Sequence, residues 1–166
     1  VSNWGDIIMA PAGFAHDIRP KEGVQAIRFG VTHPNSNHDI KGVPPCRLIP
    51  VDDGQANPNL IHTKLKALVD RNGTSTDWTE IAVSDNRNYA TYTHELPGQS
   101  SGSTLHSDEN RWWVVLQGKI AWSVENEDSF VTGPGDVVYV EKGKSYSIVT
   151  TGESSSIRLT VSAPVI

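Results

Sequence analysis

The chain has 166 residues, of which 37% are hydrophobic, and this is enough for one domain of ordinary size with one core. Its net charge of −5, without a block of basic residues, argues against nucleic-acid binding, and no apolar run reaches the roughly 20 residues of a membrane helix. The single cysteine, Cys46, excludes an internal disulfide and a cysteine-based zinc site. Because no signal-peptide pattern is visible, we expect a cytoplasmic protein that binds neither nucleic acid nor membrane.

The first third of the chain is expected to begin with strands and to continue as an irregular connection. Residues 1–34 are rich in β-branched and aromatic residues with rough alternation, which predicts two strands joined by a turn. Residues 35–57 show little periodicity and contain many Pro, Gly, Asn and Asp residues, which is typical of a connector.

One helix is predicted next, over about residues 58–70. Asn57 can cap it, Pro58 suits the first helical position, and Gly73 would end it. Its apolar face is formed by residues at i, i+4 and i+7, which are Ile61, Leu65 and Leu68.

From Trp78 onward the pattern changes to short strands separated by turns. These strands are TEIAVSD, NYATYTHEL, RWWVVLQG, KIAWSVEN, SFVTG, DVVYVEKG, SYSIVTTG and SIRLTVSAP. Short strands at this spacing, uninterrupted by a second helix, predict an all-β barrel or double-sheet jelly roll rather than a parallel βαβ sheet.

An internal repeat relates the two ends of the chain. A shift of 130 residues places Gly5-Asp6 on Gly135-Asp136, Gly13 on Gly143, and His16 on Tyr146. The repeat predicts three parts: the tail of a first, incomplete unit over residues 1–36, a connector with the helix over 37–77, and a complete unit over 78–166.

The glycines and polar residues of 78–164 follow two spaced motifs. The first contains Gly98, Thr104, His106, Arg111 and Gly118, and the second contains Gly135, Glu141, Gly143 and Tyr146. This spacing resembles that of the cupin family, and residues 5–16 match the second cupin motif in full through Gly5, Pro11, Gly13 and His16. The chain therefore looks like a truncated two-domain cupin, or bicupin. The resemblance implies an all-β double-stranded β-helix (jelly-roll) barrel with a short connecting helix.

The resemblance also implies that the complete barrel has a degenerate metal site. In cupins that bind Fe, Mn, Ni, Zn or Cu, three His and one Glu of these motifs hold the metal. Here Thr104, Arg111 and Tyr146 stand at three of the four positions, so that only His106 remains. A guanidinium stays protonated and cannot coordinate a cation. We therefore expect no metal cofactor in this barrel, whereas His16 would be a ligand only in a completed first barrel.

Two interpretations of the degenerate site remain open. In the first, Arg111 holds a small anion, with Thr104, His106 and Tyr146 as hydrogen-bond donors and Trp113 as an apolar wall. In the second, these groups satisfy one another and the barrel is structural. Glu125, Glu141 or a bound anion is expected to neutralise Arg111, while Asp108 and Glu109 are expected in a loop.

Strand alternation predicts the orientation of these side chains. Arg111, Trp113 and Val115 should point into the barrel, with Trp112 and Val114 outside, and Tyr146 and Ile148 should point inward from the opposite side. An inward-facing His94 is expected at the mouth of the same site.

Two classes of function follow from this pattern. One is a metal-free binding or structural barrel. The alternative is part of a metal-dependent bicupin enzyme (dioxygenase, isomerase or decarboxylase) whose divalent transition metal lies in the first barrel. Because the two N-terminal strands would be marginal alone, they are expected to pack on the barrel or on a second copy, which would give a homodimer.

Overall fold

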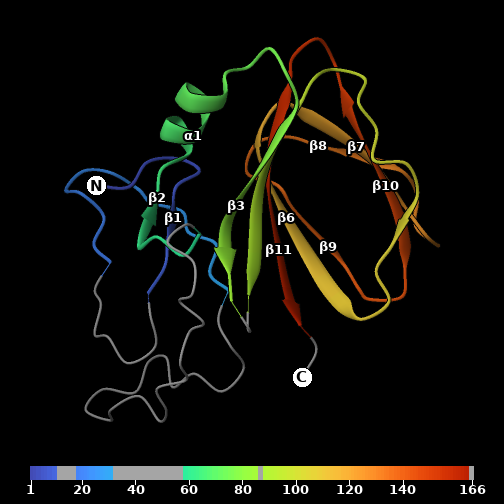
Figure 1. Ribbon diagram of the computed structural model, residues 1–166, viewed down its shortest axis with the longest axis horizontal. Helices are drawn as coiled ribbons and strands as arrows, with labels where there is room; N and C mark the ends of the chain where they lie inside the picture. Colours follow the sequence, from blue (N-terminus) through green and yellow to red (C-terminus); the bar gives the residue numbers. More distant parts are fainter. Residues whose placement is uncertain (11–17, 32–57, 86–87, 165–166) are drawn as a thin grey trace.

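The computed structural model describes residues 1–10, 18–31, 58–85 and 88–164, and Figure 1 shows their arrangement. Most of these residues from Trp78 onward lie in antiparallel strands, which confirms the predicted all-β class. No helix of this part of the chain has the length and apolar character needed to cross a membrane. The second-motif residues Pro11, Gly13 and His16, the connector 35–57 and the predicted cap Asn57 lie outside the described residues.

Two antiparallel sheets face each other to form the barrel (Figure 1). The larger sheet has the order β3 (Trp78–Ser84), β4 (Tyr89–Glu95), β11 (Ser156–Pro164), β6 (Glu109–Gln117) and β9 (Val137–Val140). The smaller sheet has the order β5 (Thr104–Leu105), β10 (Ser145–Thr151), β7 (Lys119–Val124) and β8 (Phe130–Thr132). The chain thus crosses repeatedly between the two sheets, as in a jelly roll.

The barrel interior is an aromatic and aliphatic core supplied by both sheets. Trp113 and Val115 of β6 meet Trp122 of β7 and Tyr146 and Ile148 of β10 in one buried cluster. The rings of Trp113 and Trp122 meet edge to face at 5.3 Å. The predicted inward orientation of these strands is therefore confirmed, because residues two apart on a strand point to the same face.

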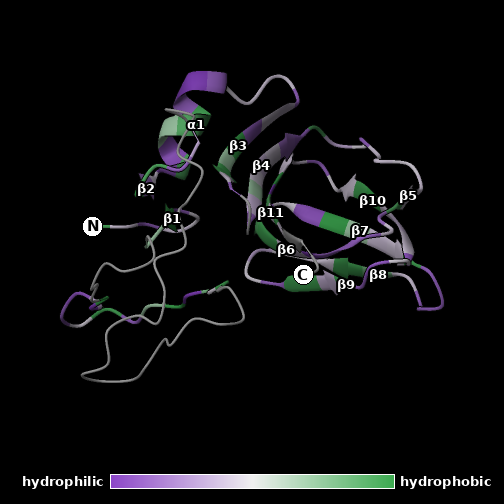
Figure 2. Cartoon of the chain, turned by 60° about the horizontal axis from the view of Figure 1, so that its bottom comes forward, coloured by the Kyte–Doolittle hydropathy of each residue, from purple (hydrophilic) through white to green (hydrophobic). Residues whose placement is uncertain are grey.

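The outer face of the larger sheet is also covered. Helix α1 (Leu65–Asn72) places Leu68 against Tyr92, Val114 and Ile157. Val114 lies outside the barrel, as predicted, but it is buried beneath this helix. Figure 2 shows α1 and β2 beside β3, on the side of the larger sheet away from β7 and β10.

The helix begins later than the sequence pattern predicts. His62–Thr63 form the short strand β2, which pairs with β1 (Ile7–Ile8), and the helix starts only at Leu65. Ile61 therefore does not share the apolar face of the helix and is 66% exposed. The predicted end is correct, because Gly73 caps the helix with a φ of 76°.

The N-terminal segment is anchored to the outer face of the barrel in the same chain. Trp4 Nε1 donates to the Leu116 carbonyl at 2.9 Å, and the Tyr92 hydroxyl donates to the Gly5 carbonyl at 2.6 Å. Asp6 accepts from the backbone N–H of Leu65 at 3.0 Å, and His62 Nε2 lies 2.9 Å from its carboxylate. Asp6 therefore caps the helix from a distant segment.

Of the two strands predicted within residues 1–34, the described residues contain only β1. Residues 18–31 form no strand, and Ile27 is 93% exposed. β-branched composition favours a strand only when a neighbouring strand supplies ladder hydrogen bonds and a face to bury.

The turn that opens the internal repeat has the same local structure in both copies, whereas residues 18–31 lack the strands of residues 148–161. In each turn, the N–H of the first residue donates to the Asp carboxylate: Asn3 to Asp6 at 2.9 Å, and Gly133 to Asp136 at 2.8 Å. In each turn the backbone N–H of the Asp also donates to the carbonyl oxygen of the first residue, Asn3 or Gly133, at 3.1 Å. Gly5 and Gly135 both adopt positive φ, of 80° and 96°, and a strand follows each turn.

Candidate functional site

Three strands bring the degenerate motif residues together at one end of the barrel. Thr104 of β5 pairs with Tyr146 of β10 across the smaller sheet. His106 follows β5, and its carbonyl accepts a 2.7 Å hydrogen bond from the N–H of Gly143. Arg111 enters from β6 of the larger sheet. The residues that the sequence singled out are therefore neighbours in space.

His106 and Tyr146 form one half of this site. His106 Nε2 lies 2.8 Å from the Tyr146 hydroxyl, and the two rings stack at 5.7 Å. Trp113 supports Tyr146 from the core, with ring centroids 4.9 Å apart. Because Trp113 is only 2% exposed, it belongs to the packed interior behind Tyr146.

Glu109 forms the other half with Arg111, and it was not among the predicted site residues. It is the first residue of β6, not a loop residue, and its Oε1 accepts from Arg111 Nε at 2.7 Å and also from Nη2. The same oxygen lies 3.6 Å from His106 Nδ1. Residues 109 and 111 share a strand face, so alternation could have revealed this partner.

The partners expected for Arg111 are engaged elsewhere or lie on the surface. Glu125 accepts the backbone N–H of Ser145 at 3.0 Å, and Glu141 is exposed. Arg111 instead pairs with Glu109, which lies two residues away on the same strand. His106, Glu109, Arg111 and Tyr146 are called the Arg111 cluster below.

The electrostatics of the Arg111 cluster keep its ring groups uncharged near neutral pH. Burial, reinforced by the positive charge of Arg111, lowers the pKa of His106 below 6.5. Burial raises the pKa of Tyr146 above 10.0 in spite of Arg111. The site thus combines one ion pair with a neutral imidazole and a protonated phenol.

The donor set does not fit a transition metal. Its carboxylate is occupied by Arg111, whose positive charge lies beside the position that a cation would take. Within the described parts of the chain, no group of three or more His, Cys, Asp or Glu residues is arranged to hold a metal ion. We therefore derive no metal-dependent chemistry at this site.

His94 was expected to line the mouth of the site, and the structure places its ring on the other face of the sheet. It pairs with Ile157, which packs under α1, and its ring stacks on Trp78 at 5.5 Å. Its Nδ1 lies 2.9 Å from the carbonyl of Thr76. His94 therefore does not belong to the Arg111 cluster.

Residues 92–162 match the family model of the cupin domain. No curated protein matches the chain. A solved structure from Thermus thermophilus shares 22% identity and a TM-score of 0.54, over 61% of this chain and 95% of that chain.

Two further solved structures share the fold at low identity. An uncharacterised Klebsiella pneumoniae protein with a double-stranded β-helix domain is 21% identical, with a TM-score of 0.50, over 55% of this chain and 80% of its own. A predicted oxalate decarboxylase from Thermotoga maritima is 24% identical, with a TM-score of 0.50, over 52% of this chain and 79% of that chain. Residues 92–162 are thus similar to a cupin domain, and the solved structures share the fold of this barrel.

Proposed function

We propose that the barrel is a metal-free binding module that takes a small carboxylate or phosphate anion at the Arg111 cluster. The observation that carries this proposal is the pairing of Arg111 with Glu109. Two N–H groups of the guanidinium converge on one carboxylate oxygen inside the site. Glu109 is thus an internal stand-in for the carboxylate of a ligand.

Two physical properties of the ion pair favour the replacement of Glu109 by a ligand anion at Arg111. Both side chains are 25% exposed, so water reaches them and neither charge is trapped. An ion pair of this kind contributes about 0–1 kcal/mol, which a ligand carboxylate can match. His106 and Tyr146 add hydrogen-bonding groups that carry no opposing charge.

The test uses acetate and inorganic phosphate as probes, with isothermal titration calorimetry of the whole chain. Glu109→Gln removes the internal competitor, so the affinity for the probes should rise several-fold. Arg111→Ala should abolish binding both in the parent chain and in the Glu109→Gln variant. Glu127→Gln, which removes a surface carboxylate paired with Lys144, is the matched control and should leave the affinity unchanged.

Two results would reject the anion site. One is the absence of saturable binding in the Glu109→Gln variant, and the other is binding that survives Arg111→Ala. Either result would favour the structural interpretation, in which the cluster only satisfies its own polar groups.

A second candidate is the metal-dependent bicupin enzyme, and the repeated turn favours it. The turns of residues 3–6 and 133–136 share the same hydrogen bonds, as expected for two related units. In this proposal His16 is a metal ligand of the first unit. Elemental analysis of the protein made from its complete reading frame should then show a transition metal that His16→Ala removes and His106→Ala retains. Metal lost equally in both variants would contradict it.

The homodimer through the N-terminal strands stays a prediction. Residues 1–10 pack on the barrel of their own chain, while Val24 and Ile27 of the following segment leave apolar surface exposed. Light scattering coupled to size exclusion measures the mass, and a strict monomer at all concentrations would exclude the dimer.

A further inference from the structure

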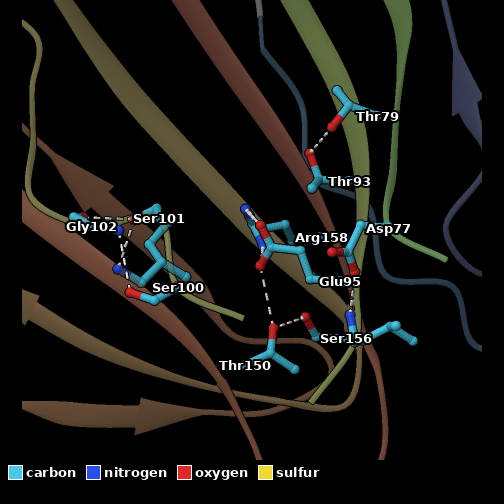
Figure 3. A network of polar contacts seen from close by, with 12 residues as sticks. Asp77, Thr79, Thr93, Glu95, Ser100, Ser101, Gly102, Thr150, Ser156 and Arg158 are labelled. Carbon is cyan, nitrogen blue, oxygen red and sulfur yellow. Dashed lines mark hydrogen bonds and ion pairs between the residues drawn. The ribbon is translucent and has the colours of Figure 1, made fainter. Parts of the chain in front are cut away.

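A pocket opens away from the Arg111 cluster, toward the other end of the barrel. It has a volume of about 270 Å³ and lies between the edge strands β3 and β4 and the loop that follows β4. Its lining is Asp77, Trp78, Thr79, Thr93, His94, Glu95, Gln99 and Ser100. Figure 3 shows several of these residues together with the ion pair of Arg158 and Glu95.

Strand register shows that this pocket is separate from the Arg111 cluster. Across the larger sheet, Thr79 pairs with Thr93, and Thr93 pairs with Arg158. Arg158 in turn pairs with Val115, which belongs to the interior cluster. Because directly paired residues point to the same face of a sheet, all of these side chains lie on the inner face. Arg111 pairs with Ser162, which is four residues further along β11. At about 3.3 Å per residue, the two sites lie about 13 Å apart along the strand.

Glu95, one of the lining residues, belongs to a buried ion pair. Arg158 Nη1 and Nη2 donate to the two carboxylate oxygens of Glu95 at 2.6 and 2.7 Å, and Thr150 donates to Glu95 at 3.3 Å (Figure 3). The side chains of Arg158 and Glu95 are 8% and 16% exposed. Their charges cancel, so the pair gives the pocket neither an anion site nor a cation site.

The walls of the pocket are held in place from both sides. The loop after β4 is tied to β10 by hydrogen bonds from the N–H groups of Gly98 and Ser101 and by a bridge between Ser100 and Val149. On the opposite wall, Asp77 accepts the N–H of Leu96 at 2.7 Å. This carboxylate is thereby engaged, and the pocket exists before a ligand arrives.

Two aromatic residues of the lining turn their rings away from the polar groups. Trp78 and His94 pair across β3 and β4, and their rings stack on the outer face of the sheet. The imidazole of His94 is fully buried there. Neither ring therefore offers a hydrogen-bonding group to a ligand on the inner face.

The remaining lining groups are neutral and both donate and accept hydrogen bonds. They are the hydroxyls of Thr79, Thr93 and Ser100 and the amide of Gln99. The hydroxyls of Thr79 and Thr93 lie 3.4 Å apart, one on each of two neighbouring strands (Figure 3). A ligand in this pocket would therefore meet several uncharged polar groups beside one carboxylate, that of Asp77, which can accept a hydrogen bond from a ligand hydroxyl.

We propose that this pocket binds a small uncharged polyol, such as a single monosaccharide. Each ligand hydroxyl can donate and accept, and this matches the mixture of hydroxyls and amide in the lining. The volume lies just below the range of roughly 300–1,000 Å³ that is typical of larger ligands, which limits the occupant to one small molecule.

The test is an NMR titration of the ¹⁵N-labelled chain with glucose, xylitol, acetate and ammonium as separate probes. Glucose or xylitol should give saturable shifts of the Thr93 and Gln99 amide signals. Thr93→Val keeps the shape but removes a hydroxyl, and it should weaken binding at least tenfold. Gln99→Ala, on an exposed loop, should also weaken it.

Matched control variants show whether the polyol binds in this pocket. Thr91→Val changes a threonine on the same strand and face, paired with Thr160 and outside the pocket lining, so binding should be unchanged. Arg111→Ala should also leave it unchanged. Absence of saturable polyol shifts, equal loss in Thr91→Val, or preferred binding of acetate or ammonium would each overturn the proposal.

Discussion

Two of the arginine–glutamate pairs among the described residues, one at each end of the barrel, differ in almost every physical respect. Arg111 and Glu109 lie two residues apart on one strand, and each side chain is 25% exposed. Arg158 and Glu95 are 63 residues apart, join two strands, and are 8% and 16% exposed. In our proposal the first pair exchanges Glu109 for a ligand, whereas the second pair is buried and held between two strands.

This difference follows from the surroundings of each charge. Burial removes water from Arg158 and Glu95, so each charge depends on the other and on Thr150 for compensation. Arg111 keeps contact with solvent and therefore loses little when its partner leaves. One end of the barrel therefore contains a buried ion pair, and the other end contains a partly exposed ion pair that we propose recognises a charged ligand.

The largest expected effect comes from breaking the buried pair. Arg158→Ala leaves the Glu95 carboxylate buried without its cation, and the free energy of unfolding should fall by roughly 3–5 kcal/mol. Urea denaturation at neutral pH measures this loss. The double variant Arg158→Met with Glu95→Leu should recover much of it. A loss below about 1 kcal/mol would show that the pair is not buried in solution.

Lowering the pH should destabilise the protein through the pair of Arg158 and Glu95. Burial alone would raise the pKa of Glu95, but the hydrogen bonds and charge of Arg158 outweigh it and hold the pKa below 4.5. A depressed carboxyl pKa contributes stability above the unfolded value, and this stability is lost as pH falls through the folded value.

Denaturation curves over the acid range, from neutral pH downward, test this expectation. The parent chain should lose stability more steeply than Glu95→Gln, and the two should converge at low pH, because protonated Glu95 and the amide are both uncharged. Parallel profiles across the whole range would contradict it.

A smaller effect is expected on the titration of His106. Arg111 is the second cause, after burial, of its lowered pKa. Arg111→Ala should therefore raise the pKa of His106 toward 6.5, while Arg158→Ala should leave it where it is. NMR titration of the imidazole signals gives both values, and an equal shift in the two variants would remove the distinction between the two ends.

The smallest effect is expected on stability at the exposed pair. Arg111→Ala should change the free energy of unfolding by about 0–1 kcal/mol, because its charge interaction is screened by solvent. The same urea experiment measures it beside Arg158→Ala. A loss as large as that of Arg158→Ala would mean that both pairs are structural.

Part of the candidate site could be predicted because it depends on local rules. Strand alternation correctly placed Trp113 and Tyr146 in the interior, and spacing brought His106 and Arg111 to one end. Glu109 shares the face of Arg111 by the same alternation, yet its assignment to a loop concealed it. Contacts between distant segments gave no comparable signal, as His94 shows.

The sequence by itself determined the all-β class, the alternation along the strands and the glycine turns. These features depend on local geometry: a period of two along a strand and a positive φ at glycines such as Gly118, where an added Cβ would lie 2.5 Å from the Ser155 carbonyl oxygen. Such constraints can be recognised within a few residues.

Only the tertiary structure decided the pairing of Arg158 with Glu95, the late start of α1 and the polar pocket beside β3 and β4. The helix starts at Leu65 because His62–Thr63 pair with Ile7–Ile8 and Asp6 caps its first turn. The ion pair and the helix start each join segments about 60 residues apart in the chain. Their partners are selected by which strands become neighbours and which charges lose water, and no local pattern encodes either choice.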